Sequence, residues 1–160
     1  MFQEIAAEQL KLNMNGMFVL LIWAIGNIIV GLLLAAKHKK HSEKWGFYIA
    51  NAAWNSVNLV LALGSLYMLS SINPEHEQLK EIIYTFFNFE KILVLNLGLD
   101  IAYIAIGSFL VERGKHTHKQ SFVGYGQALW LQGGFLFLLD MILYMINTFY
   151  SQRYAVYILF

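Results

Sequence analysis

ILVLNLGLDIAYIAIGSFLV, from Ile92 to Val111, is the stretch that decides the fold. Its length and apolar character are sufficient for an α-helix to cross the hydrocarbon core of a bilayer. The stretch nevertheless carries Asn96, Asp100 and Tyr103, which share one helical face because they are spaced by four and three residues. Polar side chains within a membrane span are expected to face other helices rather than lipid. The sequence therefore predicts a membrane-spanning helix whose polar face lies inside a helical bundle.

The opposite face of the same stretch is made of small residues. Gly98, Ala102 and Ala105 occur there at spacings of four and three. Small residues at such spacings let two helices approach each other closely. We therefore expect both faces of this helix to be covered by other helices, and we expect the protein to form a homo-oligomer, most simply a dimer.

The overall composition is that of a membrane protein. The chain has 160 residues, of which 58% are hydrophobic and 13% charged, and its mean hydropathy is +0.53. Soluble domains contain about 25% charged residues. The expected partner is therefore the lipid bilayer, and the net charge of +1 gives no reason to expect a nucleic-acid partner. The lack of cysteine excludes disulfides, thiol catalysis and thiolate metal sites.

Hydrophobic periodicity predicts an all-α polytopic membrane protein, with residues 1–160 forming a single membrane domain. Four transmembrane helices, arranged as two helical hairpins, are expected at about 16–36, 45–69, 92–112 and 122–147. Amphipathic or aromatic patterns predict segments that lie at the membrane interface at 1–15, 74–90 and 148–160. For the second of these, the alternative is that its helical part forms the first turns of the third span, projecting out of the membrane.

The two halves of the chain also show a weak similarity to each other. A shift of 76 residues places Gly31 on Gly107 and Trp54 on Trp130. Two hairpins in the same orientation would be a parallel internal repeat. Four apolar helices can also produce such matches by chance, so both explanations stay open.

The distribution of basic residues predicts the orientation in the membrane. The two short loops and the helix ends beside them carry Lys37, Lys39, Lys40, Lys44, Arg113, Lys115 and Lys119. Short loops rich in Lys and Arg remain in the cytoplasm. We therefore expect both basic loops to be cytoplasmic and both termini to lie outside.

The candidate binding residues are polar side chains expected at similar depths in the four spans. At a rise of about 1.5 Å per residue, Asp100 and Asn58 both lie roughly 18–20 Å from the cytoplasmic ends of their helices. One bundle could bring such residues together as a polar core. The candidates for binding a ligand or ion are Asp100, Asn96, Tyr103, Asn58, Asn55, Asn51, Asn27, Gln132, Asp140 and Tyr144.

Asp100 raises the central chemical question. An ionised carboxylate in the middle of a bilayer costs about 2.5–3.5 kcal/mol even on lenient scales, and the predicted spans contain no Lys or Arg to pair with it. Protonation, hydrogen bonds from Asn, Gln and Tyr, or a bound cation would lower this cost. One hypothesis is a binding or transport protein whose polar core takes a proton, a cation or a small polar ligand. The alternative is a non-enzymatic scaffold or lipid-binding accessory protein in which the polar network only fixes helix packing.

An enzymatic function has little support in the sequence. Paired acids could perform acid–base chemistry, but no phosphate-binding loop, HExxH or GxSxG motif occurs. The glycines at 124, 126, 133 and 134 are better explained by close helix contacts. All five His lie outside the spans, which argues against haem between the helices. We expect no metal site and no cofactor.

Two stretches resemble a known group of proteins. NLGLDIAYIAIG, from Asn96 to Gly107, and GYGQALWLQGGFLFLLD, from Gly124 to Asp140, are similar to segments of small uncharacterised four-helix membrane proteins of bacteria. The resemblance covers about the second half of the chain. It implies four helices and a bacterial inner membrane, and it implies no activity because the function of that family is unknown.

Overall fold

The computed structural model describes residues 2–159, and the side chains of residues 2–154. It contains four helices and, within the described residues, no strand. The helices are α1 (Phe2–Lys37), α2 (Glu43–Ser70), α3 (Leu79–His116) and α4 (Gln120–Leu159). All four have a segment long and apolar enough to cross a membrane, so the prediction of an all-α protein with four such helices is confirmed.

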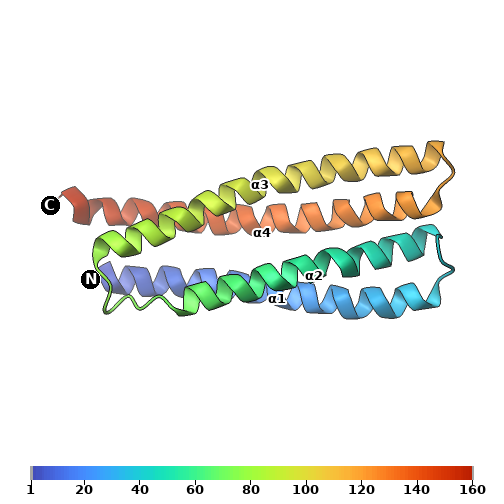
Figure 1. Ribbon diagram of the computed structural model, residues 1–160. Coiled ribbons are helices and arrows are strands. Elements are labelled where there is room, and N and C mark those ends of the chain that lie inside the picture. Colours follow the sequence, from blue (N-terminus) through green and yellow to red (C-terminus); the bar gives the residue numbers. More distant parts are fainter. Residues whose placement is uncertain (1, 160) are drawn as a thin grey trace.

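The helices form an elongated bundle (Figure 1). α1 packs along α2, α3 packs along α4, and α2 also packs on α4. The short connections 38–42 and 117–119 lie at one end of the bundle, whereas both chain ends and the connection 71–78 lie at the other. The two short loops, together with the adjoining helix ends that carry most of the Lys and Arg residues, are therefore on the same side of the molecule.

Local sequence explains where the helices begin and end. The single proline, Pro74, lies in the long connection between α2 and α3, where it interrupts no helix. Ser42 precedes α2 in an extended conformation, and its hydroxyl accepts a hydrogen bond from the Trp45 backbone N–H at 3.3 Å. This cap satisfies one of the free donors at the helix start.

α2 and α4 meet near the short loops through their backbones. A Cβ atom at Gly124 would collide with the backbone of Glu43 and Phe47, and a Cβ at Gly46 would collide with Ser121. The Gln127 amide also donates a hydrogen bond to the Glu43 carboxylate at 2.6 Å. Glycine is therefore required for the close approach of the two helices at this crossing.

The opposite end of the bundle is closed by side chains from three helices. Its cluster of buried residues comprises Ile5 and Ala6 of α1, Ile82 and Phe86 of α3, and Tyr150 and Tyr154 of α4. Most of the three segments predicted to be interfacial is thus made of turns continuous with α1, α3 and α4. Their position relative to a bilayer surface stays a prediction, and residue 160 and the side chains of 155–159 lie outside the described residues.

The small-residue face of α3 is not covered by other helices of the chain. Gly98, Ala102 and Ala105 are all exposed, and a Cβ at Gly98 would have no atom of another element within 4 Å. The expectation that both faces of α3 are covered is therefore wrong for a single chain. The physical reason is that α3 packs chiefly on α4, which covers only the side that carries Asp100. The homo-oligomer stays a prediction.

Candidate functional site

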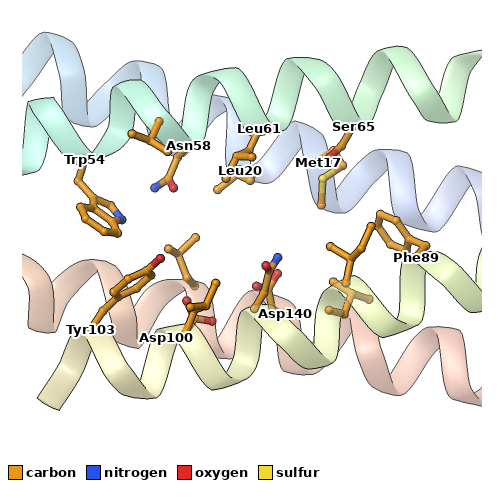
Figure 2. A pocket seen from close by; sticks show the side chains of 16 residues that line it. Met17, Leu20, Trp54, Asn58, Leu61, Ser65, Phe89, Asp100, Tyr103 and Asp140 are labelled. Carbon is orange, nitrogen blue, oxygen red and sulfur yellow. The ribbon is translucent and has the colours of Figure 1, made fainter. Parts of the chain in front are cut away.

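A cavity of about 170 Å³ lies in the middle of the bundle, with side chains from all four helices around it. Figure 2 shows α2 and α3 on opposite sides of this cavity. Met17 and Leu20 of α1, together with Leu136 and Asp140 of α4, line its inner side. An apolar protein cavity of about 150 Å³ is large enough to bind benzene. The space can therefore hold a small organic group.

Asp100 of α3 is the most deeply buried polar residue in the cavity wall. Its side chain is 1% exposed, and its Oδ2 atom has no hydrogen-bond partner among the described residues. The approach of α4 fixes its place, because a Cβ at Gly133 would lie 2.9 Å from the Asp100 carbonyl oxygen. A buried carboxyl oxygen without a partner is unfavourable. A residue of the cavity wall thus carries a buried hydrogen-bond acceptor whose capacity is unused.

A second carboxyl group, that of Asp140 on α4, makes the cavity acidic. Asp140 is 6% exposed, and the side chain of Asn96 on α3 hydrogen-bonds its carboxyl group. No Lys, Arg or His lines the cavity to offset these two acids. Such a wall favours an occupant that carries a positive charge or a hydrogen-bond donor.

Trp54 and Tyr103 close the end of the cavity nearer the short loops (Figure 2). Their rings meet edge to face, with centroids 4.5 Å apart at an interplanar angle of 75°. The Trp54 Nε1 atom is buried and has no hydrogen-bond acceptor among the described residues. Trp54 is not among the residues predicted from the sequence, since a tryptophan in a span is usually explained by packing. Two residues of the cavity wall, Trp54 and Asp100, therefore carry an unused donor and an unused acceptor.

Asn58 connects the cavity to an amide network between α1, α2 and α4. Its Nδ2 atom donates to Asn55 Oδ1 at 3.3 Å and to Gln132 Oε1 at 3.5 Å. Gln132 also accepts from Trp23 Nε1 at 3.0 Å and donates to Asn51 Oδ1 at 2.5 Å. The three amides other than Asn58 do not line the cavity. They hold helices together and keep Asn58 in place.

The ten predicted site residues therefore separate into two groups and two single residues. Five of them line the cavity: Asp100, Asn96, Tyr103, Asn58 and Asp140. Asn55, Asn51 and Gln132 form the adjoining network. Asn27 lies elsewhere and donates to the Trp23 backbone oxygen one turn earlier in α1, at 2.9 Å. Tyr144 lines a separate hollow with Phe87, Glu90, Lys91 and Val94.

A second buried network, near the chain ends, is not predicted from the sequence. The Asn147 side chain accepts from Gln9 Nε2 at 2.8 Å and from Asn13 Nδ2 at 3.0 Å, and it donates to Asn13 Oδ1 at 2.8 Å. Tyr154 donates its hydroxyl to Gln9 Oε1 at 2.9 Å. Gln9 and Asn13 fall in the segment predicted to be interfacial, where polar side chains are expected in solvent. Their spacing of four residues was the available signal for a shared buried face.

The comparison with protein families gives a match over residues 19–141, to a family described as of unknown function, DUF6992. The chain belongs to this family. No curated protein and no solved structure matches the chain. The predicted resemblance to an uncharacterised family is thus confirmed, whereas the bacterial origin stays a prediction.

The DUF6992 match separates the two polar regions of the molecule. Asp100, Asp140, Asn58 and Trp54 all lie within residues 19–141. The second network, formed by Gln9, Asn13, Asn147 and Tyr154, lies entirely outside that range. The family region therefore includes both carboxyl groups of the cavity but not the network near the chain ends.

Proposed function

We propose that this DUF6992 protein is an integral membrane protein that binds a small ligand in the cavity beside Asp100. The ligand presents a hydrogen-bond donor, or a positive charge, to the carboxyl group. The observation that carries the proposal is the buried Oδ2 atom of Asp100, a residue that lines the cavity, because this atom has no hydrogen-bond partner among the described residues. A ligand that satisfies this atom gains a hydrogen bond and removes the penalty of an unpaired buried group.

The polar groups in the cavity wall indicate which class of ligand would bind. An ammonium group carries a positive charge and up to three N–H donors, which suits two neighbouring carboxyl groups. The Trp54 N–H offers a further contact to any acceptor on the ligand. We therefore place a protonated amine first among the ligands, ahead of a neutral hydroxyl compound.

A scaffold role is the second candidate, and the amide networks favour it. The side chains of Asn58, Gln132 and Asn51 bridge α2 and α4 and satisfy one another, as expected of groups that only fix helix packing. This role leaves Asp100 Oδ2 and Trp54 Nε1 unexplained, because neither atom makes a hydrogen bond that could fix a helix.

The orientation in the membrane is part of the same proposal. We place the end with the two short loops in the cytoplasm, since most of the basic residues are concentrated there. A bacterial inner membrane is the location implied by the resemblance described above.

Native mass spectrometry of the protein released from gentle detergent tests the proposal. The wild type and the Tyr144→Phe control, altered outside the cavity, should both carry an additional mass after incubation with hexylammonium. Asp100→Asn should lose that mass while it keeps the same oligomeric state. Equal masses for wild type and Asp100→Asn would overturn the proposal and favour the scaffold role. If Asp100→Asn does not assemble, Trp54→Phe serves as the second variant, with weakened retention of the additional mass expected and unchanged retention contradicting a role for the cavity.

A further inference from the structure

α2 and α3 border the cavity with their backbones apart, although their side chains meet where the Trp54 and Tyr103 rings contact and where Leu69 packs with Phe89 and Leu93. α2 packs on α1 and α4, and α3 packs on α4, but within the described residues the backbones of α2 and α3 make no direct contact. Figure 2 shows the cavity side chains in the space between these two helices. The outer side of the cavity is therefore a gap between helices rather than a packed wall.

The edges of this gap are apolar and exposed. Val57 and Leu61 of α2 are 54% and 55% exposed, and Ile92 and Leu99 of α3 are 48% and 41% exposed. All four residues also line the cavity. In a helix that spans a membrane, exposed apolar residues of this kind face lipid acyl chains. The gap therefore opens toward the hydrocarbon of the bilayer.

The two ends of the cavity along the bundle axis are closed by packed side chains. Toward the short loops stand the rings of Trp54 and Tyr103, and beyond them the glycine-mediated contact of α2 with α4. Toward the chain ends lies a buried cluster of Met17, Leu69, Phe89, Leu93 and Leu143. The gap between α2 and α3 is therefore the most direct route by which a ligand can reach Asp100.

Polarity changes across the width of the cavity. The four residues at the gap are apolar, whereas the buried part of the lining includes three polar side chains, Asn58, Asp100 and Asp140, that are no more than 6% exposed and lie among the apolar Leu20 and Leu136. A ligand that matches both sides has an apolar part in the gap and a donor or positive charge inside. A small hydrated ion matches only the inner side.

We infer that the ligand is a membrane-dissolved amphiphile with a cationic amine head, and that it reaches Asp100 sideways through the gap between α2 and α3. This inference rests on the proposed function and adds to it the ligand class and the route. The volume of about 170 Å³ holds the head and the first part of the chain, and the remainder of the chain lies between the edges of the gap.

Binding of two amines of different length to the protein in lipid nanodiscs tests the inference. The probes are radiolabelled ethylammonium and dodecylammonium, with binding to protein-free nanodiscs subtracted. Leu99→Trp fills the gap, and Ile101→Trp is the matched control because Ile101 is 58% exposed on the same helix but does not line the cavity. Val57→Trp fills the gap from the other helix if Leu99→Trp does not fold.

In the wild type, binding of dodecylammonium should depend on Asp100. Asp100→Asn should lower the affinity for both amines by roughly tenfold or more. Leu99→Trp should lower the affinity for dodecylammonium by roughly tenfold, because the alkyl chain of the amine loses apolar contact in the gap. Ile101→Trp should leave the affinity for dodecylammonium unchanged. Loss of ethylammonium affinity in Leu99→Trp should be much smaller.

The two proposals fail in different ways. If neither amine binds in a manner that depends on Asp100, the proposed function is overturned, and the amphiphile inference falls with it. If ethylammonium binding depends on Asp100 but dodecylammonium responds equally to Leu99→Trp and Ile101→Trp, the binding site stands. The lateral route and the amphiphile are then wrong.

Discussion

Asn147 holds together the polar network near the chain ends, and its replacement by alanine should destabilise the protein strongly. The side chain is fully buried and takes part in four hydrogen bonds, with Gln9, twice with Asn13, and with the backbone oxygen of Leu143. Asn147→Ala removes all four. Because Gln9 and Asn13 belong to α1 and Asn147 to α4, the change acts on the packing of these two helices.

The magnitude follows from the groups that lose their partner. The Gln9 N–H, the Asn13 N–H and the Asn13 carbonyl oxygen all bond to Asn147. Each buried polar group left unsatisfied costs about 1–3 kcal/mol. Water that enters the space vacated by the amide would bond to some of these groups and so reduce the loss of stability. We expect the free energy of unfolding to fall by roughly 3–6 kcal/mol.

Reversible unfolding in mixed micelles, followed by far-ultraviolet circular dichroism, measures this change. The matched control is Met145→Ala on the same helix, since Met145 is 64% exposed, and it should change the free energy of unfolding by less than about 0.5 kcal/mol. A loss below about 1 kcal/mol in Asn147→Ala would refute the reasoning. It would mean that the network does not contribute to the packing of α1 on α4.

Three further substitutions test the packing of the bundle. Phe86→Ala removes a side chain that is 1% exposed in the cluster near the chain ends; we expect a loss of about 3–5 kcal/mol in the same unfolding assay, and a loss near zero would contradict that burial. Gly124→Val places a side chain against the Glu43 backbone, so electron spin resonance between labels on α2 and α4 should report a larger separation than in the wild type; an unchanged distance would show that glycine is not required. Trp23→Phe removes the bond to Gln132 but keeps an aromatic ring against Phe135, stacked at 3.8 Å, and should cost about 1 kcal/mol; no loss would remove the indole N–H from the network.

The sequence was sufficient to predict the helices and the direction of their polar faces. The high cost of placing Asn58 or Asp100 in lipid leaves few alternatives to the bundle interior. Both residues are buried, at 3% and 1% exposure. The spacing of the polar residues and the cost of placing each of them in lipid depend only on the local sequence. Both can therefore be read from a single sequence.

Other features depend on how the two halves of the chain cross, which no local pattern encodes. Gln9 and Asn13 are buried because α1 extends alongside α3 and α4 near the chain ends. Gly98 is exposed because α3 packs mainly on a single neighbour. The cavity itself exists because α2 and α3 stand apart, and Trp54 becomes part of a site only through that separation.

The central claim is that Asp100 binds a ligand, and its most direct test is the free energy of unfolding of wild type and Asp100→Asn, each with and without hexylammonium. A ligand that binds only the folded state stabilises it by about 2.7 kcal/mol at a hundred times its dissociation constant. The account predicts that the wild type gains stability in this way with rising hexylammonium. It predicts that Asp100→Asn, folded with the same helical content, gains none. An equal gain in both proteins, or no gain in either, would contradict the claim.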